Sequence, residues 1–162
     1  MKEAVLGIIV GTSHILLGEK LKGSIGVSTL NGPCGTVKAG EDLFEALERI
    51  VAEQLCIGID KDYTVYAGTI VLHADGEPYM RMYVYTIRKI WGQPTKTDNM
   101  RPEYVTRKFI PFNRMFESDS KWFGRMAEGE HFNADVFYRK VAREFIGIKI
   151  LRFDDEPQRL SA

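Results

Sequence analysis

The clearest hydrophobic pattern in the chain lies between residues 43 and 57. Apolar residues recur there with the period of an α-helix, at Leu43, Leu47, Ile50 and Val51. This spacing predicts an amphipathic helix with one buried face. Asp42 and Glu45 have the spacing of a capping box at its first turn, and Gly58 follows where a glycine commonly ends a helix.

Most of the remaining pattern favours β-strands. Apolar or alternating segments predict strands at residues 5–10, 14–17, 63–73, 79–90, 104–109, 132–138 and 144–153. Asp75 and Gly76 join the two longest segments, which indicates a hairpin. Residues 118–126 favour a second helix, with Ser118 as its N-cap. We expect a single α+β domain over residues 1–162, with a frayed tail at 154–162.

Composition places the chain among ordinary globular proteins. Of its 162 residues, 44% are apolar and 27% are charged, and the formal net charge is zero. A nucleic-acid polymer is therefore not an expected partner, since such binders usually carry a basic excess. No apolar run approaches the roughly 18 residues of a membrane span. Cys34 and Cys56 show neither a disulfide framework nor metal-ligand spacing, and we expect a cytoplasmic protein.

Four residues around the predicted helix have a distinctive spacing. Five residues separate Gly35 from Glu41, seven separate Glu41 from Arg49, and Glu53 follows Arg49 after one helical turn. This arrangement resembles the Nudix box, G-x5-E-x7-R-E-U-x-E-E-x-G-U, where U is a bulky aliphatic residue. The resemblance implies that Glu41 and Arg49 brace the junction between loop and helix. Without it, both would be read as solvated charges.

The resemblance extends well beyond the box. Further segments occur in the family's order between residues 5 and 140, namely ILLGEK at 15–20, LNGPCGTVKAGE at 30–41, GTIVLHADGEPYMRMYVY at 68–85, DNMRPEYV at 98–105 and IPFNRMFESDSKWF at 110–123. They are similar to the MutT-homologue branch, which hydrolyses oxidised purine nucleoside triphosphates. The resemblance implies an α/β/α sandwich with a mixed, curled sheet. It also implies a nucleoside di- or triphosphate as partner, with a purine as one candidate base, and a monomer or homodimer.

The box departs from the family pattern where the family binds metal. Ile50 and Gln54 stand in place of two glutamates, and Cys56 replaces the glycine near the end of the box. Nudix hydrolases use such carboxylates to hold Mg²⁺, for which Mn²⁺ can substitute, and the metal activates a water. The resemblance leaves Glu53, the backbone carbonyl near Gly35 and the Gln54 side chain as candidate ligands, so any metal should bind weakly.

Two alternatives stay open at the candidate metal site. Glu53 is either a residual metal ligand and catalytic residue or a surface glutamate paired with Arg49 one turn away. Ile50 is readily explained as core packing, because it lies within the apolar stripe of the helix. The family also uses a later glutamate, for which this chain has Asn99, with Asp98 beside it.

A candidate base pocket follows from the same resemblance. Asn31 matches an asparagine before the box, Phe116 replaces a tryptophan that stacks on the base, Ser118 replaces one acidic residue and Asp119 matches a second. An aromatic face can stack on a purine while an amide and a carboxyl read its edge. Taken singly, these residues could instead be a turn residue, a core aromatic and helix-start polar groups.

Two functions therefore remain open from the sequence. The first is a Nudix-type pyrophosphohydrolase with weakened or altered activity, in which water attacks a bridging phosphorus and a nucleoside monophosphate is released. The second is a catalytically inactive module on the same fold that binds a nucleotide or a protein. The missing charged ligands favour the second, whereas the length of the resemblance favours the first.

Overall fold

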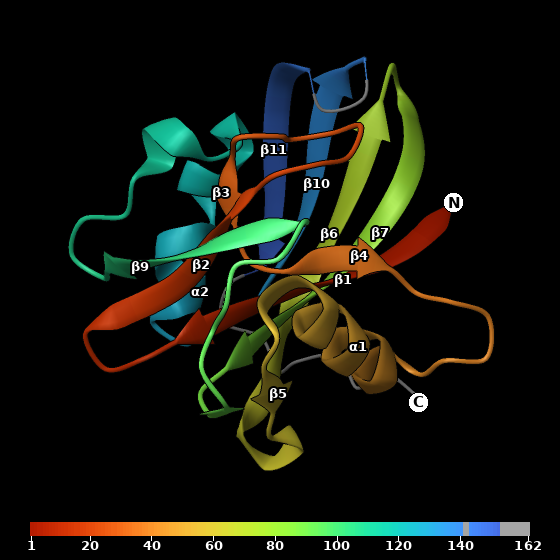
Figure 1. The fold of residues 1–162 in the computed structure, drawn as a ribbon. Helices are drawn as coiled ribbons and strands as arrows, with labels where there is room; N and C mark the ends of the chain where they lie inside the picture. The colour runs from red at the N-terminus through yellow and green to blue at the C-terminus, as the bar shows by residue number, and fades with distance from the viewer. Residues whose placement is uncertain (141–142, 153–162) are drawn as a thin grey trace.

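The computed structural model describes residues 1–140 and 143–152 (Figure 1). Their central feature is a mixed, curled sheet with the strand order β11-β10-β6-β7-β1-β2-β3, in which β4 also pairs with β1 and β9 with β2. The strands are β1 Lys2–Val10, β2 His14–Lys20, β3 Leu30–Asn31, β4 Cys34–Thr36, β6 Thr64–Ala74, β7 Glu77–Ile87, β9 Met100–Thr106, β10 Phe132–Arg139 and β11 Glu144–Arg152. Parallel pairing joins β1 to β7 and β6 to β10, while the other pairs in this sheet are antiparallel.

Shorter elements complete the described chain. Two α-helices are present, α1 Leu43–Leu55 and α2 Phe123–Ala127, together with the 3₁₀-helices η1 Lys61–Tyr63, η2 Phe112–Arg114 and η3 Glu117–Lys121. A small second sheet pairs β5 Gly58–Ile59 with β8 Ile90–Trp91. None of the described helices has both the length and the apolar character needed to cross a lipid bilayer.

A hydrophobic core lies on each face of the sheet, and β1 contributes alternate residues to both cores. Leu6 and Ile8 point into a core that also contains Trp122 and Phe123 from the η3–α2 segment. Val5 points into a second core with the apolar face of α1. This alternation follows from the two-residue period of a strand. The expected fold class, a mixed sheet between helices, is therefore confirmed.

The start of α1 is as predicted, but its end is not. Glu45 N donates to Asp42 Oδ1 over 2.8 Å and Asp42 N donates to Glu45 Oε2 over 3.4 Å, which completes the capping box. The prediction that Gly58 ends the helix is wrong. Cys56 adopts the left-handed conformation instead, with φ of 60° and ψ of 32°, and Gly58 already belongs to β5. The chain leaves the helix two residues earlier because Ile57 and Ile59 are both buried in the core beside α1.

The second predicted helix differs more from the prediction. Residues 118–126 divide between η3 and α2, and Ser118 lies inside η3 instead of capping a helix. Its buried hydroxyl group is hydrogen-bonded to the Tyr138 hydroxyl over 3.0 Å, so it is not available to cap a backbone N–H. Packing of Trp122 and Phe123 against the sheet outweighs the local helical pattern here.

The strand predictions hold in outline. The hairpin at Asp75 and Gly76 joins β6 to β7 as expected. The strand predicted at 104–109 begins earlier, at Met100, because β9 pairs with β2 along its length. The tail predicted at 154–162 lies outside the described residues.

Candidate functional site

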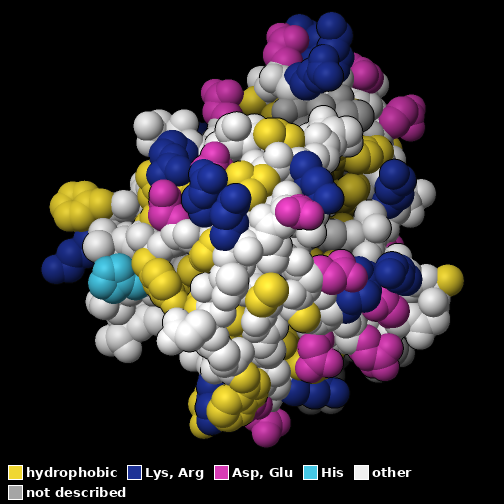
Figure 2. Space-filling view, in the orientation of Figure 1, with side chains coloured by type: hydrophobic (Ala, Val, Ile, Leu, Met, Phe, Trp, Pro, Cys, Tyr) yellow, Lys and Arg dark blue, Asp and Glu magenta, His cyan; other side chains and the backbone are white. Residues whose placement is uncertain are grey.

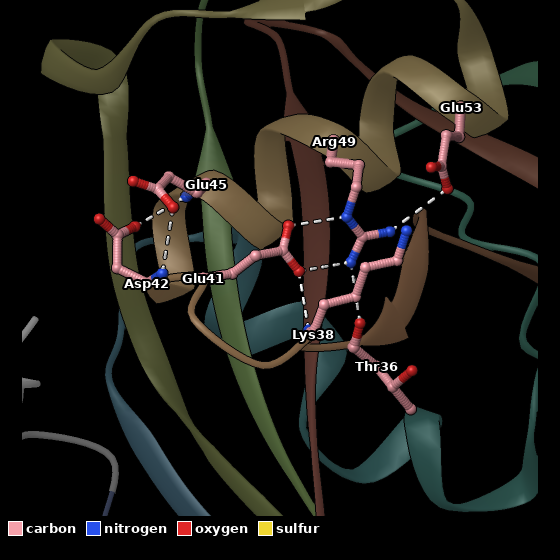
Figure 3. A network of polar contacts seen from close by, with 7 residues as sticks. All are labelled: Thr36, Lys38, Glu41, Asp42, Glu45, Arg49 and Glu53. Atoms are coloured by element: carbon pink, nitrogen blue, oxygen red, sulfur yellow. Dashed lines mark hydrogen bonds and ion pairs between the residues drawn. The ribbon is translucent and has the colours of Figure 1, made fainter.

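Glu41 and Arg49 form a two-bond ion pair between the loop before α1 and the helix (Figure 3). Arg49 Nε donates to Glu41 Oε2 over 2.7 Å and Arg49 Nη2 donates to Glu41 Oε1 over 2.9 Å. Arg49 Nη2 also donates to the Thr36 carbonyl oxygen over 3.0 Å, while Lys38 N donates to Glu41 Oε1 over 2.7 Å. These bonds lower the pKa of Glu41 to about 2, chiefly through the hydrogen bond from Arg49. The geometry is that of a brace that joins β4, the loop and α1.

The Gln54 side chain is hydrogen-bonded to the backbone of Cys34, the first residue of β4. Its Nε2 donates to the Cys34 carbonyl oxygen over 2.8 Å, and its Oε1 accepts from Cys34 N over 3.3 Å. The side-chain amide is therefore bonded through both its nitrogen and its oxygen to one backbone residue. Burial raises the pKa of the Cys34 thiol to about 11, so this cysteine is protonated at neutral pH.

Ile50 fills the position one helical turn before Gln54. Its side chain is 2% exposed and packs in the same core as Leu47 and Val51, which confirms its interpretation as core packing. A Cβ atom on Gly35 would lie 2.9 Å from Ile50 Cδ1, so the isoleucine and the glycine are in close contact. An apolar side chain here supplies no ligand to a cation.

Glu53 is the carboxylate that remains at this end of α1. Its side chain is 52% exposed, and its nearest cationic partner is Arg49 at 3.4 Å. Among the described residues, no group of three or more His, Cys, Asp or Glu side chains could hold a metal ion. A Mg²⁺ ion needs several hard oxygen ligands, preferably anionic ones. The residues present at the box therefore do not fit a Nudix-type magnesium site.

A cavity of about 440 Å³ lies on the sheet face that also carries η3. It is walled mainly by apolar side chains, among them Leu6, Ile70, Met82 and Val136. This volume falls within the usual range for small-molecule sites, about 300–1,000 Å³. The cavity is therefore large enough to hold a small-molecule ligand.

The structure brings six of the predicted site residues to this one cavity. They are Asn31, Gly35, Gln54, Phe116, Ser118 and Asp119, which line its wall. Glu53, Glu41 and Arg49 lie outside the lining. The predicted base pocket and two residues of the Nudix box, Gly35 and Gln54, thus line one continuous surface.

Local backbone geometry explains how Asn31 is held. Gly32 N donates to Asn31 Oδ1 over 2.8 Å, which leaves the amide Nδ2 free to donate. Gly32 passes so close to β1 that a Cβ atom there would overlap the carbonyl oxygen of Gly7. Only glycine allows this approach, so packing against β1 requires Gly32 at this position.

Asp119 supplies the buried carboxyl group at the inner end of the cavity. It is 5% exposed, and burial raises the pKa of its carboxyl group to about 7. Phe116 N donates to its Oδ2 over 3.2 Å, a contact that opposes this rise in pKa. A buried carboxyl group whose pKa is shifted by desolvation and that lines a cavity is a common feature of binding sites.

Four further lining residues were not singled out by the sequence. Lys20 and Lys22 bring positive charge to the cavity, while Trp122 and Tyr138 line its inner part. Lys20 lies within the ILLGEK segment that resembles the family, which could have drawn attention to it. No local pattern marks Tyr138, because it reaches the site only through the pairing of β10 with β6.

Surface charge offers no sign of a polymer-binding site on the visible face. Figure 2 shows Lys and Arg side chains interspersed with Asp and Glu over this face of the described chain. Such mixing differs from the basic stripe expected of a nucleic-acid binder. The cavity is therefore the stronger candidate for the functional site.

Two of the curated proteins that the chain resembles have the same name. The oxidized purine nucleoside triphosphate hydrolase of Danio rerio is 30% identical over 132 residues, which cover 81% of this chain and 83% of that protein. The protein of that name from Mus musculus is 28% identical over 128 residues, covering 78% and 80%. No protein-family model matches the chain.

Solved structures share the fold. The mutator MutT protein of Bacillus halodurans superposes with a TM-score of 0.77 and 16% identity, covering 93% of this chain and 97% of that one. The MutT Nudix hydrolase of Burkholderia pseudomallei gives a TM-score of 0.59 and 21% identity, covering 68% and 86%. Together with the extent of the curated relatives, this shows that the chain belongs to the MutT-like branch of the Nudix hydrolase family.

Proposed function

We propose that this protein binds a purine-like nucleoside phosphate in the cavity and that its metal-dependent hydrolysis is strongly weakened compared with its relatives. The observation that carries the proposal is the Gln54 side-chain amide, which is hydrogen-bonded on both sides to the Cys34 backbone beside an otherwise well-formed base pocket. The protein would thus still bind the nucleotide but hydrolyse it only slowly.

Recognition is supported by the chemical character of the cavity wall. Phe116 offers an aromatic face for stacking, and Asn31 and Asp119 offer a donor and an acceptor for the edge of a base. Lys20 and Lys22 provide positive charge that suits a phosphate group. The relatives' name, which refers to oxidised purine nucleoside triphosphates, supports a nucleotide of this class.

Weak hydrolysis is supported by the ligands at the Nudix box. A divalent metal ion contributes several kcal/mol of charge stabilisation in phosphoryl chemistry, and it needs carboxylates to be held. Ile50 and Gln54 remove two of them, and Gln54 also engages the Cys34 carbonyl oxygen that a metal could otherwise use. Glu53 is left as the one box glutamate near this position, and its half-exposed carboxylate is paired with Arg49 at 3.4 Å.

The test measures hydrolysis and binding in the same protein preparation. A panel of nucleoside triphosphates, including oxidised purines, is incubated with Mg²⁺ and separately with Mn²⁺, and released monophosphate is quantified. Glu53→Gln is the matched control, because it changes charge without changing size. In parallel, the melting temperature is recorded with each nucleotide in EDTA, since a ligand that binds only the folded state raises it.

The two readouts separate the outcomes. We expect at least one purine nucleotide to raise the melting temperature in EDTA, with turnover near that of the Glu53→Gln control. Rapid metal-dependent turnover that is lost in the control would refute weak hydrolysis and establish a rebuilt Nudix site. No rise in melting temperature with any nucleotide would refute nucleotide binding.

A further inference from the structure

The inner end of the cavity adds two polar side chains, those of Trp122 and Tyr138, to the predicted pair Ser118 and Asp119. Ser118 and Asp119 are buried there, at 4% and 5% exposed, and Ser118 Oγ lies 3.0 Å from the Tyr138 hydroxyl. Trp122 lines the same cavity and is 1% exposed. Buried polar groups carry a free-energy cost unless they are paired, so their gathering at one cavity needs a reason.

The indole N–H of Trp122 differs from the other polar groups of the cavity because it is buried without a hydrogen bond in the described structure. Within residues 1–140 and 143–152, Trp122 Nε1 is the one buried side-chain nitrogen or oxygen that makes no hydrogen bond. The indole N–H lies near enough to the Asp119 carboxyl group to lower the pKa of that group. Its position does not, however, meet the geometry of a hydrogen bond to it. A buried donor without a partner is rare in native proteins. A ligand atom that accepts from it would remove the cost.

The hydroxyl pair supplies a second donor. Whichever of Ser118 and Tyr138 donates to the other, one hydroxyl proton remains for a third group. Both hydroxyl groups are neutral over the physiological pH range, so this donor does not depend on an ionisation. Asp119 supplies the acceptor, because Phe116 N occupies only its Oδ2. The inner end therefore offers two neutral donors and one carboxylate acceptor.

We infer that the cavity selects a planar heterocycle with a cyclic amide edge, and that Tyr138 and Trp122 determine this selectivity. The inference rests on the proposed nucleotide-binding function and narrows its ligand class. A carbonyl oxygen has two lone pairs and can accept from both donors, while the adjacent ring N–H donates to Asp119. An amidine edge, as in adenine, offers one ring nitrogen that accepts a single bond, which leaves one buried donor unpaired.

The expected discrimination follows from that unpaired donor. Leaving one buried donor without a partner corresponds to a loss of affinity of about tenfold. Inosine and adenosine triphosphates form a suitable pair of probes, since they differ only at this edge of the base. Titration calorimetry of each probe is performed in EDTA at pH 8, where the Asp119 carboxyl group, whose pKa is about 7, is mostly ionised. We expect inosine triphosphate to bind at least about tenfold more tightly than adenosine triphosphate.

A double variant tests the hydroxyl pair. Ser118→Ala with Tyr138→Phe removes both partners together, a change that usually costs little stability because neither group is left unpaired. We expect the double variant to lose most of the preference for inosine triphosphate, because bound adenosine triphosphate then leaves no hydroxyl donor unpaired. Tyr83→Phe is the matched control, because the Tyr83 hydroxyl donates to Glu3 and belongs to the core on the opposite sheet face. Trp122→Phe tests the indole N–H in the same way.

Each outcome bears on a distinct claim. Equal affinity for the two probes, or an equal loss of both in the double variant, would overturn the selectivity while leaving nucleotide binding intact. Tighter binding of adenosine triphosphate would also overturn it. If neither probe binds the wild-type protein, both the selectivity and the proposed nucleotide-binding function are refuted.

Discussion

Replacing Gln54 with glutamate is the sharpest test of whether the Gln54–Cys34 hydrogen bonds stand in place of a metal site. The substitution keeps the size of the side chain but removes the Nε2 donor that bonds to the Cys34 carbonyl oxygen over 2.8 Å. It also places a negative charge beside that oxygen. In the absence of a cation, the carboxylate and the carbonyl oxygen repel each other.

The magnitude can be worked from these contacts. Loss of one hydrogen bond and the exposure of its carbonyl partner to a carboxylate should lower the free energy of unfolding by about 2 kcal/mol. For a domain of this size, that corresponds to a fall in melting temperature of roughly 4–8 °C. Mg²⁺ should reverse part of the loss, because the carboxylate and the Cys34 carbonyl oxygen then become ligands. At a Mg²⁺ concentration about tenfold above its dissociation constant, the recovery is about 1.4 kcal/mol.

Thermal unfolding in EDTA and in excess Mg²⁺ measures both effects. Gln54→Leu is the control, because it loses both hydrogen bonds to Cys34 without gaining a charge. It should be destabilised in both buffers and should not respond to Mg²⁺. An unchanged melting temperature for Gln54→Glu in EDTA would refute the role of the Gln54 bonds. A loss of stability that Mg²⁺ does not reverse would refute the assignment of this position to a metal site.

Three further predictions concern single residues. Cys56→Gly should raise the free energy of unfolding by about 1 kcal/mol in chemical denaturation, because Cys56 holds a left-handed conformation that glycine adopts without strain; a decrease would contradict this. Glu41→Gln should be less stable than the wild type above pH 4.5, and the difference should vanish as the pH falls toward 2, because the pKa of Glu41 is lowered to about 2 in the folded protein; a constant difference in urea titrations across this range would argue against the brace. Asp119→Asn should gain stability over the wild type as the pH rises from about 4 to 7, because the carboxyl group ionises in the unfolded chain in this range while its raised pKa, about 7, keeps it protonated in the folded protein; parallel stability curves would exclude this.

Local patterns predicted those features that depend on residues near each other in the chain. The capping box of Asp42 and Glu45 and the buried stripe of α1 follow from helical geometry alone. The hairpin at Asp75 and Gly76 follows from turn chemistry. Arg49 and Glu53 meet because they are one helical turn apart.

Family resemblance extended the prediction to residues far apart in sequence. It indicated that Asn31, Phe116, Ser118 and Asp119 belong to one pocket, and all four line the same cavity. It also indicated the brace between Glu41 and Arg49, whose bonds are present. Their roles in binding remain predictions, because proximity within a cavity does not by itself identify a ligand.

The sequence by itself determined the α+β class and the position of α1, because period, capping and turn preferences act over a few residues, and its family resemblance indicated the brace. Only the tertiary structure decided that Gln54 bonds to Cys34 and that Ser118 meets Tyr138 instead of capping a helix. Only the tertiary structure also shows that, among the residues it describes, the Trp122 N–H makes no hydrogen bond. These contacts join residues that the sheet and the core bring together, and they depend on hydrogen-bond geometry and burial that no local pattern encodes.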